Sequence, residues 1–295
     1  MNYRIKLYLM NQKGLVVLAA LIKTIGSSII HSVIVSKDKA MVRDYYDEIC
    51  DLCKKNSIIY YDRKNDISDQ VNIAYCLAVG WRWMIKSGSK LIVLHDSLLP
   101  KYRGFSPLVN SLLNREPIIG VTALFACDRF DEGDIIFQES ISIEYPMPIQ
   151  TAIERISECY KLLACRIAAC IAHGTPLLSS PQDHTKATYS PWLDDEDYRI
   201  DWDAPLLEVH HFIISVGFPF AGASSFVNGR CVRIIEAEPV DGFVMARSAP
   251  GKILFIDNGC PLIVTGSGLL RVTKIIDSTS RESLLPWSSL RKRFT

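Results

Sequence analysis

The sequence predicts an α/β fold: a Rossmann-like, doubly wound and mainly parallel sheet, followed by a smaller β-rich domain with an OB-like barrel or open meander. Short Val-, Ile- and Leu-rich runs alternate with helical patterns in the first part of the chain, as in a parallel sheet covered on both faces. The last hundred residues instead hold short apolar runs broken by Gly, Asn and Asp. With 295 residues, 48% of them hydrophobic, the chain can bury a core in each domain.

The first domain, residues 1–180, is assigned from the order of these runs. Strands are expected at 3–9, 28–36, 57–61, 71–79, 90–95, 121–127 and 134–143. Helical patterns are expected at 15–26, 39–56 and 149–172, with a further helix starting near residue 105. Because ligands of open parallel sheets bind outside the carboxyl ends of the strands, the residues just after each strand are the candidate site.

A segment rich in Pro, Ser, Thr and Gly at 173–191 is predicted to link the domains. Beyond it, residues 187–295 form the small β-rich domain, with one helix expected at 205–216. This domain has 11 Lys and Arg residues against 13 Asp and Glu residues. Because a surface that binds nucleic acid is basic, we do not expect this domain to bind nucleic acid. The sequence is compatible with a homodimer formed through apolar surface on this domain.

Composition excludes several classes of protein. The net charge of +1 provides no general attraction for nucleic acid, and no apolar run is long enough to span a membrane. The N-terminus lacks a secretory signal pattern, so a cytoplasmic location is expected. The odd number of cysteines, nine, argues against a disulfide framework, and the pair Cys50 and Cys53 lacks the further ligands of a zinc site. We therefore expect no metal.

The best candidates for catalytic residues lie at the end of the predicted strand at 90–95 and beyond it. His95 ends this strand, and an imidazole there needs polar partners or water. Asp131, in the turn "DRFDEGD", is the best candidate for a carboxylate that fixes the histidine tautomer. On the residues alone, a catalytic pair and a satisfied histidine with an unrelated turn aspartate are equally compatible with the pattern.

The stretches "HDSLLPKYRGFSPLVNSLLN" and "GVTALFACDRFDEGDII" resemble the folate-dependent formyltransferases, which include methionyl-tRNA formyltransferase, a purine-pathway transformylase and the sugar N-formyltransferases. The resemblance implies transfer of a formyl group from N10-formyltetrahydrofolate to an amine, with His95 and Asp131 as the catalytic histidine and aspartate. The family's Asn-x-His motif departs at its first position, where this chain has Val93. Valine cannot donate a hydrogen bond to the developing oxyanion, and losing one such donor typically slows a reaction by about a hundred- to a thousandfold.

Two accounts of Val93 follow. In the first, a protonated His95 or a main-chain N–H stabilises the oxyanion, Asp131 handles the proton, and Ser97 or Asn110 is an additional donor. In the second, the chain is a weakened relative, or a non-catalytic module that binds folate or sugar.

The resemblance also implies roles for neighbouring residues. The folate is expected against the main chain of "AVGWRWMI" and the loop before Asp131, and the residues implied are Gly80, Trp81, Trp83, Leu98, Cys127 and Asp128. The turn after His95 implies substrate contacts for Lys101, Arg103 and Gly104, although the two cations could equally face solvent.

Among acceptors, a nucleotide-linked amino sugar fits best. A transfer RNA would require a basic second domain, and the purine enzyme resembles only the first domain. The aromatic residues of "TYSPWLDDEDYRIDW", Tyr189, Trp192, Tyr198 and Trp202, are candidates for stacking a nucleotide base or for packing between domains.

Overall fold

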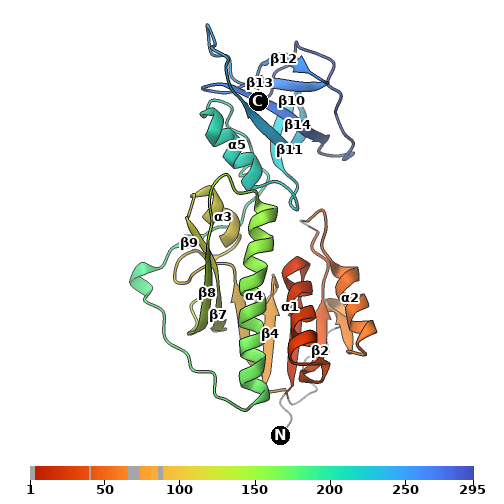
Figure 1. The fold of residues 1–295 in the computed structure, drawn as a ribbon, viewed down its shortest axis with the longest axis vertical. Coiled ribbons are helices and arrows are strands. Elements are labelled where there is room, and N and C mark those ends of the chain that lie inside the picture. Colours follow the sequence, from red (N-terminus) through yellow and green to blue (C-terminus); the bar gives the residue numbers. More distant parts are fainter. Residues whose placement is uncertain (1–3, 40, 66–72, 86–88) are drawn as a thin grey trace. The chain divides into compact units, whose positions relative to one another are not determined.

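The computed structural model describes residues 4–39, 41–65, 73–85 and 89–295 (Figure 1). The chain divides into two compact units. The first comprises residues up to 111, 116–143 and 152–192, and the second comprises 112–115, 144–151 and 193–295. The boundary near residue 192 lies later in the chain than the expected linker, because part of that linker pairs with the first unit.

The first unit is built on a seven-stranded sheet in the order β3-β2-β1-β4-β5-β7-β8. Its strands are β1 (Ile5–Leu9), β2 (Ile30–Val35), β3 (Tyr60–Asp62), β4 (Tyr75–Val79), β5 (Lys90–His95), β7 (Ile118–Phe125) and β8 (Ile135–Ser142). The first five are parallel, whereas β7 pairs antiparallel with both β5 and β8. The expected α/β sheet, mainly parallel, is confirmed.

The first unit also contains α1 (Asn11–Thr24), α2 (Tyr46–Lys55), and most of α3 (Pro107–Leu113) and α4 (Ile149–Ala172). All five residues of β1 are buried, as in a strand covered on both faces. In α4 the buried residues recur every three or four positions, which is the spacing of one helix face, and they include Ile156, Tyr160, Leu163 and Ile167. Helices α1 and α4 approach each other at the end of β5, where the Lys13 ammonium lies 5.6 Å from the centroid of the Tyr160 ring.

The expected linker is structured in the described residues. Tyr189–Ser190 forms strand β9, which pairs in parallel with β6 (Arg103–Gly104), the short strand after β5. The side chain of Gln182 is buried. The Pro- and Ser-rich composition therefore indicates that this segment has no long helix or strand. Its backbone nevertheless pairs with the first unit through β9.

The second unit is an antiparallel sheet of five strands in the order β10-β11-β14-β13-β12. They are β10 (Ala223–Val227), β11 (Arg230–Val240), β12 (Ile253–Asp257), β13 (Cys260–Val264) and β14 (Leu269–Asp277). Helix α5 (Leu206–Ser215) buries Val209 and Ile213. Trp202, a candidate for base stacking, is buried in this unit against Phe294, with ring centroids 5.7 Å apart.

The cysteines carry no metal signature in the part of the chain that is described. Cys50 and Cys53 are buried free thiols, and burial raises the pKa of Cys53 to about 12. No group of three His, Cys, Asp or Glu side chains is placed to hold a metal ion, again among the described residues. Within those residues, no helix has the length and apolar character that a membrane span requires.

Candidate active site

Strand β5 carries His95 to the carboxyl end of the parallel strands. Val93 and His95 are two residues apart, so they lie on the same face of the sheet. On this face Val93 is in register with Ala78, which is in register with Tyr8. These residues belong to an apolar cluster that also contacts Trp81. His95 therefore follows an apolar surface at the position where polar side chains begin.

The imidazole of His95 is buried between the Tyr102 carbonyl and Asp131. Nε2 lies 2.8 Å from the carbonyl oxygen of Tyr102, and because a carbonyl only accepts, Nε2 must carry a proton. Nδ1 lies 3.5 Å from Oδ1 of Asp131. The predicted pair thus converges, with the ring orientation fixed by the main chain of the following turn.

Asp131 reaches His95 by a route that strand adjacency alone did not predict. Strand β7 runs antiparallel to β5, so it ends beside the start of β5, where the Ala126 N–H donates to the Leu91 carbonyl. The loop that follows returns toward His95. Gly104 N–H donates to Asp131 Oδ2 at 2.8 Å, and the Gln182 amide donates to the Asp131 carbonyl at 2.7 Å.

Two glycines make this loop geometry possible. Gly104 has a φ of +101°, and a Cβ there would lie 2.7 Å from the carbonyl oxygen of Ser190. A Cβ on Gly133 would lie 1.7 Å from the carbonyl oxygen of Phe125, so no larger residue fits. Asp131 itself has a φ of +57°, in the left-handed region.

Arg103 is a buried connector, and the solvated alternative for its side chain is wrong. Its side chain is 1% exposed. Nε and Nη2 both donate to Oε1 of Gln182, at 3.1 and 2.7 Å, and Nη1 donates to the hydroxyl of Tyr189 at 3.2 Å. Nη1 also lies 3.5 Å from Glu132 Oε1. Arg103 therefore joins the turn after β5, the loop of Asp131 and the segment before β9.

The other predicted substrate contacts differ in position. The ammonium of Lys101 is exposed and lies 3.5 Å from Glu116, in agreement with the solvated alternative. Gly104 contacts Asp131 through its backbone. Of Lys101, Arg103 and Gly104, only Gly104 makes a direct hydrogen bond to the predicted pair of His95 and Asp131.

Ser97 and Asn110, the expected extra donors, already hydrogen bond within the protein. The only hydroxyl proton of Ser97 is donated to the carbonyl of Lys101 at 2.7 Å. The Asn110 amide donates to the carbonyl of Ser106 at 2.9 Å, within its own helical turn. Ser97 is therefore excluded as an oxyanion donor in this arrangement, and the amide of Asn110 is held away by a local bond.

Five of the six residues expected to bind folate fall into two groups. The sixth, Leu98, is half-buried, with its side chain next to Gly120 of β7. Trp81 and Trp83 are half-buried and pack edge to face, with ring centroids 5.3 Å apart, after the turn at Gly80, whose φ is +62°. The indole N–H of Trp81 is buried and has no hydrogen-bond partner among the described residues. Cys127 and Asp128 are exposed in the loop before Asp131. These two groups remain predicted contacts.

Behind His95, a buried polar cluster anchors the next residue. Asp96 forms an ion pair with Lys13 of α1 and accepts a hydrogen bond from the hydroxyl of Tyr160 in α4. The Tyr160 hydroxyl also lies 3.2 Å from the carbonyl oxygen of Leu94. Burial raises the pKa of Tyr160 well above its ordinary value, so it remains a donor. The cluster ties the end of β5 to two helices.

Sequence reasoning missed this cluster and Gln182. Lys13 lies in the first turn of α1, two residues before the helical pattern expected at 15–26, so its burial carried no signal in the sequence. Gln182, in a polar segment, offered none.

The geometry defines a class: an α/β unit with a histidine–carboxylate pair at the carboxyl end of its sheet. Residues 70–161 match the family model described as formyl transferase, and residues 193–284 match the formyl transferase C-terminal domain. Together these matches cover more than half of the chain. The chain belongs to the formyl transferase family.

Curated relatives include the methionyl-tRNA formyltransferases of Thermotoga neapolitana and Fervidobacterium nodosum. The first is 32% identical over 66% of this chain and 60% of its own length, and the second is 30% identical over 62% and 58%. The chain thus spans less than two thirds of the length of either relative.

Solved structures with the same fold include WlaRD, described as a sugar 3N-formyl transferase. It is 17% identical, with a TM-score of 0.66 over 96% of this chain and 98% of its own. The N-formyltransferase of Helicobacter canadensis, solved with folinic acid and dTDP-3-aminofucose, is also 17% identical. Its TM-score is 0.63 over 92% of this chain and 98% of its own.

Proposed function

We propose that this protein transfers a formyl group from N10-formyltetrahydrofolate to the primary amine of a nucleotide-linked amino sugar. The observation that carries the proposal is the placement of His95 Nδ1 at 3.5 Å from Asp131, with Gly104 N–H fixing the carboxylate. Family membership supplies the class of reaction, and the folds of two sugar N-formyltransferases align over nearly the whole chain.

The residues suit the proton transfers that this reaction requires. As the amine nitrogen bonds to the formyl carbon, it becomes cationic and must lose a proton, while the folate nitrogen must gain one before its bond to that carbon breaks. Asp131 is the base for the first proton, and His95 is oriented for proton exchange through Nδ1, since Nε2–H is held by the Tyr102 carbonyl. The donor supplies the one-carbon group.

The residues also fit a folate. Trp81 and Trp83 form a half-buried aromatic wall, and the unpartnered Trp81 N–H is a donor that a ligand can satisfy.

The apolar Val93 beside His95 leaves the oxyanion without the amide of the family motif. We therefore propose an active enzyme that is slower than one with that amide.

The test is a turnover assay with nucleotide-linked 3-amino and 4-amino sugars and N10-formyltetrahydrofolate, read by mass spectrometry for the gain of one formyl group. His95→Gln and Asp131→Asn should each lose at least about a hundredfold in rate. Asp134→Asn, an exposed change in the same loop, is the matched control and should keep the rate. Equal turnover in all four proteins would overturn the mechanism.

Methionyl-tRNA is the second candidate acceptor, because the two curated relatives described above are named methionyl-tRNA formyltransferases. It is less favoured because the second domain carries more acidic than basic residues. Including charged tRNA in the same assay decides between the acceptors. A non-catalytic module would show binding of a folate analogue by calorimetry without product from any acceptor.

A further inference from the structure

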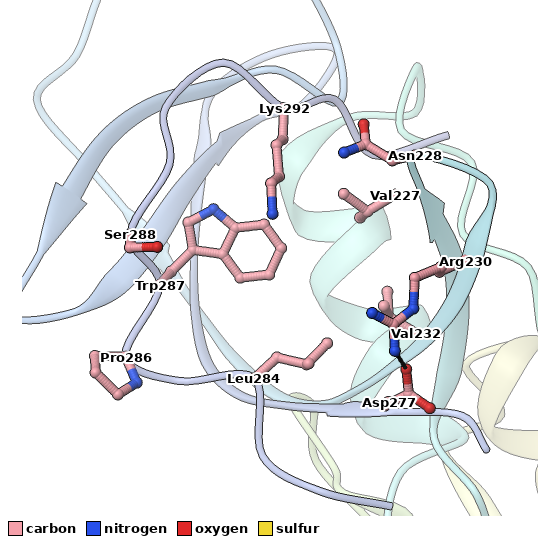
Figure 2. A pocket seen from close by; sticks show the side chains of 10 residues that line it. All are labelled: Val227, Asn228, Arg230, Val232, Asp277, Leu284, Pro286, Trp287, Ser288 and Lys292. Carbon is pink, nitrogen blue, oxygen red and sulfur yellow. Dashed lines mark hydrogen bonds and ion pairs between the residues drawn. The ribbon is translucent and has the colours of Figure 1, made fainter. Parts of the chain in front are cut away.

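The second unit contains a pocket built from the start of β11, the end of β14 and the C-terminal segment (Figure 2). The cavity measures about 220 Å³. Its lining includes Val227, Arg230, Asp277, Leu284, Trp287 and Lys292. None of these residues belongs to the proposed catalytic site, so the pocket needs its own explanation.

One side of the pocket is apolar and rigid. Trp287 is buried, and its indole N–H donates to the Ser289 carbonyl at 2.8 Å. Its ring packs against Phe294, with centroids 5.4 Å apart. Val227 and Leu284 also contribute apolar surface. The indole is therefore fixed in place, and it forms part of the apolar wall of the pocket.

The other side is cationic. Figure 2 shows Lys292 pointing into the pocket beside the Trp287 ring, and its ammonium lies 5.0 Å from the ring centroid. Lys292 forms no ion pair with any carboxylate in the described part of the chain. Arg230 lies across the pocket, with Nη2 bonded to Asp277 Oδ2 at 2.7 Å (Figure 2).

Asp277 holds Arg230 in place and does not cancel both cations. Its Oδ1 accepts the main-chain N–H groups of Thr279 and Ser280, each at 2.9 Å. These bonds lower the pKa of Asp277, which keeps it ionised. Arg230 and Lys292 therefore face one carboxylate, that of Asp277, which already accepts hydrogen bonds from Arg230, Thr279 and Ser280. The remaining guanidinium N–H groups can form paired bonds to a carboxylate or phosphate.

We propose that this pocket binds a compact anion with an apolar body, a phosphate monoester or a carboxylate whose charged group meets Arg230 and Lys292. Its body packs on Trp287. The volume is below the roughly 300–1,000 Å³ of sites for drug-sized ligands, which limits the ligand to a single ring or a branched chain. The proposal does not depend on the proposed formyl transfer.

The test is calorimetry on the full chain with phenyl phosphate and 3-phenylpropanoate, and with uncharged 3-phenylpropan-1-ol for comparison. We expect at least one anion to bind with a dissociation constant of about 1 mM or lower, and the alcohol to bind about tenfold more weakly. Binding of only one anion supports the proposal and identifies the charged group.

Arg230→Gln and Lys292→Gln should each weaken binding by about tenfold. Lys274→Gln removes an exposed cation of β14 that does not line the pocket, and it should leave binding unchanged. Thermal melting of each variant establishes that it is folded. Absence of binding by both anions, equal binding of the alcohol, or folded Arg230 and Lys292 variants that bind like the wild type would each overturn the proposal.

Discussion

Arg103→Ala tests whether the loop of Asp131 is held by a buried arginine. The substitution removes two hydrogen bonds to Gln182 and one to Tyr189, and it takes a cation from Glu132, whose side chain is 16% exposed. Breaking a buried charged network of this kind costs about 3–5 kcal/mol. We therefore expect a loss of unfolding free energy near that range, which is a large part of a typical total of about 5–15 kcal/mol.

Activity should fall with stability, for a geometric reason. Gly104, the next residue, donates the 2.8 Å hydrogen bond that fixes Asp131, so a displaced turn displaces the carboxylate. A misplacement of about 1 Å can cost a hundredfold in rate. We expect kcat to fall by at least about tenfold with little change in KM. Arg103→Lys keeps the charge and loses the forked geometry, so it should lie between alanine and wild type.

Urea unfolding followed by circular dichroism and steady-state kinetics by mass spectrometry measure the two effects. Arg129→Ala is the matched control, because Arg129 lies 3.6 Å from the same Glu132 but its side chain is 81% exposed. Exposed pairs contribute about 0–1 kcal/mol, so this control should be nearly silent. If Arg103→Ala raised KM and left stability and kcat unchanged, Arg103 would be a substrate ligand and the structural argument would fail.

Three further outcomes are expected. Val93→Asn should raise kcat in the formyl-transfer assay by about ten- to a hundredfold, because it restores a hydrogen-bond donor on the same face as His95. An unchanged kcat would mean that another group already stabilises the oxyanion. Lys13→Met should destabilise the chain by about 3 kcal/mol, because it leaves the carboxylate of Asp96 without its cation. Denaturation of Lys13→Met, Asp96→Asn and the double variant measures the coupling between the two side chains, and additive losses would refute the pairing. Burial lowers the pKa of His211 below its ordinary 6.5, so its folded form binds fewer protons, and its contribution to stability, full above pH 6.5, is lost as the pH falls below that value. Urea unfolding at pH 7.5 and 5.5 should show this loss of unfolding free energy in wild type and a smaller loss in His211→Gln. Equal losses in the two proteins would show that His211 is not the cause.

The sequence by itself determined the order of the main elements and the position of His95 at the end of a strand. Apolar runs with the periods of strands and helices are local signals, so they place β5 and α4 along the chain before any contact is known. The same locality locates His95 at the end of a strand and Asp131 in a turn. Resemblance to a family then paired these two residues.

Only the tertiary structure decided how they meet. Because β7 runs antiparallel to β5, the loop of Asp131 starts at the far end of the strand and returns, held by Gly104 and Gln182. A return of this kind depends on contacts between residues distant in the chain, which periodicity does not encode. The burial of Arg103 has the same origin: its partners come from a segment near residue 182 whose composition predicts only a loop.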